Sequence, residues 1–215
     1  MCRFSTRDFL IGTSEDSEAM AIGLLGNVTG ALLLGGESSR MGRDKAHLEW
    51  EGEAWSTRTA KMLAGLFSET LLIGGAPEER APGLRIEDPA GPQCALRGLV
   101  AALEAATSPR VLIVATDLPL LCADLLLALC AWPAGEIVVP ADQDGDHPLC
   151  AIYERESCLR VARANLEADR LSLNELLAIV GCDRVTIEQL GLTDLGRAPL
   201  SNVNTPDELA SLVKG

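Results

Sequence analysis

Residues 30–45 of the 215-residue chain read GALLLGGESSRMGRDK, an apolar run that passes directly into a polar, glycine-rich loop. The apolar part, Ala31–Leu34, predicts a buried β-strand. The loop after it holds three glycines, two serines, two arginines and a lysine. Glycines let backbone N–H groups approach an anion closely, while arginine and lysine neutralise phosphate charge. Because ligands of open α/β sheets bind at the carboxyl ends of strands, this pattern favours a phosphate-binding loop over an ordinary turn with solvated charges.

Two common phosphate-binding motifs do not fit this loop. A Walker A loop requires Gly-Lys-Ser/Thr, whereas Lys45 follows Asp44 and precedes Ala46. The dinucleotide fingerprint Gly-x-Gly-x-x-Gly is not met by the GGESSR sequence of residues 35–40. By motif, the chain is therefore neither a P-loop ATPase nor a Rossmann dehydrogenase.

Strand-like and helix-like segments alternate along the chain from Thr29 onward, which predicts an α/β fold with a mostly parallel sheet. The expected strands are Ala31–Leu34, Thr70–Ile73, Leu84–Glu87, Val111–Ala115, Glu136–Val139, Leu149–Tyr153 and Arg184–Ile187. The expected helices are Ser56–Phe67, Leu96–Ala106, Ala123–Ala131, Glu156–Asn165, Ser172–Val180 and Pro206–Val213. Most of the early strands are near-continuous apolar runs, which indicates burial on both faces of the sheet.

Length and composition predict one domain over residues 29–215, preceded by a weakly ordered extension over residues 1–28. A formal charge of −13 and a pI near 4.6 argue against a nucleic-acid partner. No stretch approaches the roughly 18 apolar residues of a membrane span, so no membrane partner is expected. Seven dispersed cysteines without a Cys-x-x-Cys pair predict reduced thiols in a cytoplasmic protein.

Two aspartates follow predicted strands and are candidate ligand-binding residues. Asp117 ends the apolar run Val111–Ala115 and could hold Mg²⁺, or it could cap the next helix. Asp88 precedes Pro89, and its carboxylate could bind a ligand or could simply begin a turn. The residues alone leave both alternatives open.

Further polar candidates lie in the second half of the chain. Asn202 and Asn204 alternate along an extended segment, so both amides can reach one ligand, although they could also be helix-entry residues. Arg170 could face a ligand or flank a helix. His147 could also face a ligand, although a single histidine in a turn is more often structural or solvated.

The glycine-rich run resembles the signature Leu-x-Gly-Gly-x-Ser-x-Arg-Met-Gly-x-Asp-Lys of the molybdenum cofactor guanylyltransferases, the MobA family. The segment Ser201–Asp207 resembles the closing Asn-x-Asn-Thr-Pro motif of that family. The resemblance runs from about Thr29 to Leu212 and implies a Rossmann-like three-layer α/β/α nucleotidyltransferase sandwich.

The resemblance also implies an activity, namely transfer of GMP from GTP to molybdenum-bound molybdopterin with release of pyrophosphate. It implies Mg²⁺ as cofactor, with Asp117 as its ligand, and molybdoenzyme apo-proteins or their chaperones as further candidate partners. The catalytic residues it implies are Arg40, Lys45 and Asp117. The implied nucleotide-binding residues are Leu33, Leu34, Gly35, Gly36, Lys45, Gly74, Asp88 and Asp117, and the implied acceptor-binding residues are Arg170, Asn202 and Asn204.

The chain departs from the family pattern at three places. Leu34 stands where alanine is usual, and Gly74 stands where asparagine is frequent. Residues 94–98 read CALRG in place of Gly-Pro-Leu-x-Gly. The alternatives are a nucleotidyltransferase of the same fold that uses CTP or makes a nucleotide sugar, and a non-catalytic relative that binds nucleotide or cofactor.

Overall fold

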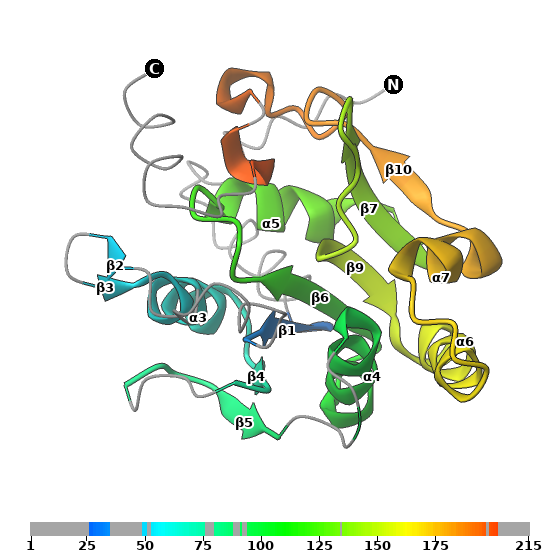
Figure 1. Cartoon of the computed structure of the whole chain (residues 1–215). Helices are drawn as coiled ribbons and strands as arrows, with labels where there is room; N and C mark the ends of the chain where they lie inside the picture. The colour runs from blue at the N-terminus through cyan, green and yellow to red at the C-terminus, as the bar shows by residue number, and fades with distance from the viewer. Residues whose placement is uncertain are drawn as a thin grey trace.

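The computed structural model describes residues 26–34, 49–50, 53–75, 80–87, 91, 94–133, 135–196 and 198–201. Its main sheet has the strand order β10-β7-β9-β6-β1-β4-β5, with a short strand β8 paired to β7 (Figure 1). Its strands are β1 Val28–Leu33, β4 Thr70–Ile73, β5 Leu84–Ile86, β6 Arg110–Ala115, β7 Ile137–Asp142, β8 Gly145–Asp146, β9 Cys150–Glu154 and β10 Asp183–Val185. A separate antiparallel pair is formed by β2 Glu49–Trp50 and β3 Glu53–Ala54.

The sheet is mostly parallel, as the sequence predicts. Strand β1 is parallel to both neighbours, β4 and β6, β4 is parallel to β5, and β7 is parallel to β10. Strand β9 is antiparallel to β6 and β7, because the short β7–β8 hairpin turns the chain straight back into the sheet. Such a short connection can join only antiparallel strands.

Helices cover both faces of the sheet, which confirms the three-layer α/β/α sandwich. Helices α3 (Trp55–Leu66) and α5 (Ala123–Ala131) pack on one face. Helices α4 (Ala95–Ala105), α6 (Arg155–Glu167) and α7 (Leu173–Val180) pack on the other. Side chains of β1 alternate between the two layers, because Leu32 faces α3 and α5 whereas Ala31 and Leu33 face α4.

All seven predicted strands and five of the predicted helices are present, with shifted ends. Strand β1 starts at Val28, before the predicted Ala31, because Thr29 and Gly30 are buried and paired with β6. Gly30 suits this position because a Cβ there would lie 2.7 Å from Phe67 Cδ2. The predicted helix Pro206–Val213 and residues 1–25 lie outside the described residues. Among the residues that the structure describes, no helix is both long and apolar enough to cross a membrane.

A polar network joins strand ends at the amino edge of the sheet. The Thr29 hydroxyl and the Thr107 N–H (2.9 Å) both donate to Glu69 Oε2, and the Ser108 N–H donates to Thr29 Oγ1 at 3.4 Å. Burial by itself would raise the pKa of Glu69, but hydrogen bonds from Thr107 and Thr29 outweigh it and leave this pKa below its ordinary value. The charged carboxylate therefore stabilises the fold.

Glu69→Gln should lower the free energy of unfolding at pH 7 by about 1 kcal/mol, because a neutral amide accepts these hydrogen bonds less strongly. Since the pKa of Glu69 is lowered in the folded chain, its contribution is complete above the ordinary glutamate pKa and is lost as the pH falls through the folded value. Urea denaturation at pH 7 and in acid should therefore show a difference that disappears in acid. Glu167→Gln, at the exposed end of α6, is the control. A difference that persists unchanged in acid would contradict this account.

Candidate active site

The carboxyl ends of β1 and β6 form the point at which the strand order reverses. From β1 the chain moves outward to β4 and β5, then crosses back over β1 to β6. Helix α3, which lies between β1 and β4 in the chain, covers one face of the sheet. Helix α4, which lies between β5 and β6, covers the other face (Figure 1). In open α/β sheets this reversal leaves a crevice at the carboxyl edge, where ligands bind.

The glycine-rich loop starts at this carboxyl edge of the sheet. Leu33 is paired with Ile73 on one side and with Ala115 on the other, and the Leu34 N–H donates to the Ile73 carbonyl at 2.9 Å. Both leucine side chains are buried, Leu33 under α4 and Leu34 in the opposite layer. Their apolar side chains therefore anchor the start of the loop.

Asp117 lies beside that start, two residues after the last paired residue of β6. The Ala115 N–H donates to the Leu149 carbonyl at 2.9 Å, and Leu118 is buried, so the segment around Asp117 is held from both sides. Asp117 is not the N-cap of the following helix, because α5 begins at Ala123 and its N-cap is Cys122. The helix-cap alternative for Asp117 is therefore wrong.

Asp117 offers a hard oxygen ligand, whereas the two thiols near it are poor metal ligands because they stay protonated. Cys150 is paired with Val114, and burial, together with nearby Asp117 and Cys122, raises the pKa of its thiol to about 12. Burial also raises the pKa of Cys122, so both thiols stay protonated near neutral pH. No cluster of three or more potential metal ligands occurs within the described part of the chain. One carboxylate completed by substrate phosphates and water is the arrangement that Mg²⁺ accepts.

Two glycines follow the carboxyl end of β4, at the same edge of the sheet. Gly74 has φ of 65° and Gly75 has φ of 60°, and the Gly74 N–H donates to the Ile86 carbonyl at 2.9 Å. Left-handed φ values suit glycine, and asparagine is among the few other residues that adopt them readily. This conformation accounts for Gly74 at a position where the MobA family frequently has asparagine. Gly75 is not among the site residues that the sequence predicts. The Gly-Gly pair after β4 nevertheless repeats the pattern of Gly35-Gly36 after the first strand.

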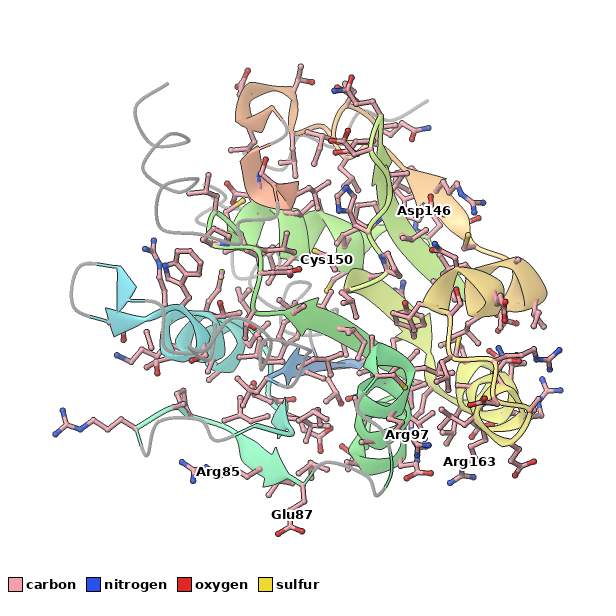
Figure 2. The ribbon with its side chains drawn as sticks, viewed as in Figure 1. Arg85, Glu87, Arg97, Asp146, Cys150 and Arg163 are labelled. Carbon is pink, nitrogen blue, oxygen red and sulfur yellow. The ribbon has the colours of Figure 1, made fainter. Side chains whose placement is uncertain are left out.

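The β7–β8 hairpin extends from the same edge of the sheet. Asp142 Oδ2 lies 3.3 Å from His147 Nε2, and both side chains are about one-eighth exposed, at 12% and 13%. The guanidinium of Arg184, on β10, forms a bidentate ion pair with Asp146, with nitrogen–oxygen distances of 2.9–3.1 Å. Figure 2 shows Asp146 beside β10. His147 therefore lies beside Asp142 within this hairpin.

The remaining predicted residues are placed as follows. Arg170 is exposed in the connection between α6 and α7, and its N–H donates to the Asn165 carbonyl at 2.8 Å. The other predicted site residues lie outside the described residues: Gly35, Gly36, Arg40, Lys45, Asp88, Asn202 and Asn204. The structure thus brings together Leu33, Leu34, Gly74 and Asp117 at adjacent strand ends.

The chain is a nucleotidyltransferase, as its match to a family model and to similar proteins shows. The chain belongs to the family described as the MobA-like NTP transferase domain, whose model matches residues 30–185. Enzymes of this family generally use a divalent metal ion.

Two similar proteins share about a third of their residues with the chain. A Pelotomaculum thermopropionicum protein named probable molybdenum cofactor guanylyltransferase is 35% identical over 188 residues, which cover 84% of this chain and 89% of that protein. A Xanthomonas euvesicatoria protein named molybdenum cofactor guanylyltransferase is 33% identical over 187 residues, which cover 86% of this chain and 94% of that protein.

Solved structures share the fold. The molybdopterin-guanine dinucleotide biosynthesis protein A of Archaeoglobus fulgidus superposes with a TM-score of 0.73 at 19% identity, covering 86% of this chain and 97% of that chain. The 2-C-methyl-D-erythritol 4-phosphate cytidylyltransferase of Thermus thermophilus superposes with a TM-score of 0.62 at 15% identity, covering 86% and 98% of the two chains.

Gly75→Ala should lower the free energy of unfolding by about 1–3 kcal/mol, because the residue keeps a left-handed φ and its Cβ would lie 2.8 Å from Leu34 Cβ. Gly65→Ala is the matched control, since nothing lies within 4 Å of a Cβ on that helical glycine. The control should gain about 0.5–1 kcal/mol from lower chain entropy in the unfolded state. Urea denaturation measures both variants, and equal stabilities would contradict the constraint at Gly75.

Proposed function

We propose that this chain transfers GMP from GTP to molybdenum-bound molybdopterin, forming the guanine dinucleotide form of the cofactor and releasing pyrophosphate. The observation that supports this most directly is the placement of Asp117 beside the start of the glycine-rich loop, at the reversal of strand order. The two similar proteins described above are both named molybdenum cofactor guanylyltransferases, which supports the choice of donor and acceptor.

The reaction is an in-line displacement at the α-phosphorus of GTP. An oxygen of the terminal phosphate of molybdopterin forms the new P–O bond, the bond to the β-phosphate breaks, and pyrophosphate leaves. The chain's contribution is to position the two phosphates and to offset their charge. Backbone N–H groups of Gly35 and Gly36 would hold the triphosphate, with Arg40 and Lys45 neutralising charge on the α-phosphate and on the departing pyrophosphate.

Mg²⁺ bound at Asp117 would neutralise phosphate charge, a role for which one carboxylate suffices when phosphates and water supply the other ligands. The segment that carries Asp117 is held by the hydrogen bond from Ala115 to Leu149 and by the buried Leu118. No covalent enzyme intermediate is required.

The two halves of the edge would bind different substrates. Asp88 and Gly74, which follow β5 and β4 in the sequence, would face the guanine nucleotide. Arg170, Asn202 and Asn204 would bind the acceptor. The product would pass to molybdoenzyme apo-proteins or their chaperones. The supply of GTP and the free thiols of the described cysteines favour a cytoplasmic location.

The purified chain should release pyrophosphate with GTP, molybdenum-bound molybdopterin and Mg²⁺, and should do so faster than with CTP, ATP or UTP. A site that pairs with one base rejects others because its own polar groups are left unpaired, an effect of about 1–3 kcal/mol per group. The measurement is kcat/KM for each triphosphate. A preference for CTP would refute the guanylyl assignment, and no turnover with any triphosphate would refute the enzymatic proposal.

Asp117→Asn should reduce kcat by at least roughly a hundredfold, about 3 kcal/mol of transition-state stabilisation, while the protein stays folded. The amide has nearly the shape of the carboxylate but lacks the charge that a metal ion requires. Asp183→Asn, at the exposed amino end of β10, is the control and should retain full activity. Titration with Mg²⁺ completes the test, because an unchanged metal dependence in Asp117→Asn would contradict the metal role.

A further inference from the structure

The histidine of the β7–β8 hairpin lies at the same carboxyl edge of the sheet as Asp117. The N–H of His147 donates to the Pro140 carbonyl of β7 at 2.8 Å, and its own carbonyl accepts from the Cys150 N–H at 2.9 Å. Cys150 pairs with Val114 of β6, and nearby Asp117 contributes to the raised pKa of its thiol. In the strand order β9-β6-β1, His147 therefore lies on the β9 side of Asp117, whereas the glycine-rich loop starts on the β1 side.

The aspartate beside this histidine lies on the face of the sheet that α5 covers. Cys150 and Val138 both pack in the core layer of that face. Asp142 follows Val138 by four residues along β7, and side chains of a strand alternate between faces, so Asp142 belongs to the same face. The hairpin pair and the carboxylate near Cys150 are therefore turned toward one region of the edge.

Asp142 holds the imidazole of His147 at one ring nitrogen. Its Oδ2 atom lies 3.3 Å from His147 Nε2, and both side chains are mostly buried. Nε2 is buried, but its alignment with the carboxylate falls short of a hydrogen bond, and no other group of the described chain is bonded to it. Buried polar atoms are almost always hydrogen-bonded, so closing this contact on ligand binding is favourable. Asp142 then fixes the ring and leaves Nδ1 for a ligand.

The charges of the hairpin are compatible with an anionic ligand at Nδ1. Asp146 is paired with Arg184 at 2.9 Å. Asp144 is exposed at the turn, where its N–H donates to Asp142 Oδ1 at 2.8 Å. An imidazolium donates from both ring nitrogens, so His147 can donate to Asp142 from Nε2 and to a phosphate oxygen from Nδ1.

We propose that His147 binds the terminal phosphate of the acceptor and that Asp142 is a positioning residue that orients its imidazole. The inference rests on the proposed function, because it adds a contact to the acceptor half of the same site. In an in-line displacement, the attacking phosphate approaches the α-phosphorus from the side opposite to the leaving pyrophosphate. The loop proposed to hold the triphosphate starts on the β1 side of Asp117, so the β9 side, where His147 lies, is left for the acceptor.

Histidine signals in nuclear magnetic resonance test this contact without turnover, because the chain has only two histidines, His47 and His147. Protein with ¹⁵N-labelled histidine is saturated with GTP and Mg²⁺, and either His47→Gln or His147→Gln assigns the signals. The two probes are inorganic phosphate and free pterin, which carries no phosphate. Phosphate should shift the ring signals of His147 to those of an imidazole protonated at both nitrogens, whereas pterin should leave them unchanged.

Kinetics separate an acceptor contact from a general loss of structure. His147→Gln should raise KM for the acceptor about tenfold and leave the Kd for GTP within about twofold, because it removes a charged hydrogen bond to one substrate only. Asp142→Asn should raise the same KM and weaken the response of His147 to phosphate. Asp144→Asn, at the exposed turn of the same hairpin, is the matched control and should behave as the parent protein.

The inference is overturned if phosphate leaves the His147 signals unchanged, if pterin shifts them as much as phosphate does, or if His147→Gln weakens GTP as much as the acceptor. If His147→Gln does not fold, the spectra of the parent and of Asp142→Asn decide. Failure of the proposed function looks different. A parent that prefers CTP, or that shows no turnover, refutes that function, whereas the response of His147 to phosphate still decides this inference.

Discussion

The buried pairing of β1 between β4 and β6 is the constraint on which the rest of this structure depends. Both neighbours run parallel to β1, so three strand ends meet at one edge. The side chains of β1 are covered on both faces, which fixes its register strongly, since a slip of one residue would exchange the two buried faces. The glycine-rich loop, Gly74 and Asp117 therefore start from a rigid base.

The amino and carboxyl edges of the sheet differ in their local structure. At the amino edge, Thr29, Glu69 and Thr107 form a satisfied polar network that joins strand ends and stabilises the fold. At the carboxyl edge, the glycines have left-handed backbone conformations, and α4 begins with a cation and without a side-chain cap. Such locally unfavourable features collect where a ligand must be bound, because the surrounding core compensates their cost.

The first turn of α4 lies between the end of β1 and the residues that follow β5. Gly98 brings the helix against Leu33, and Arg97 connects the same turn to Gly91 after β5. Arg97 stands at the variable position of the Gly-Pro-Leu-x-Gly pattern, so the departures in this segment are Cys94 and Ala95.

The sequence by itself determined the order and type of the main elements. Apolar runs long enough to be buried on both faces predicted strands such as β1 and β6, and the loop after β1 carried enough glycine and cationic residues to predict its ligand. Tertiary structure alone decided the antiparallel direction of β9, the pairing of Asp142 with His147, and the contact of Arg97 with Gly91. It also decided that Cys122, and not Asp117, stands at the N-cap position of α5. Periodicity records which faces of an element are buried, but direction and pairing depend on contacts between residues that are far apart in the chain.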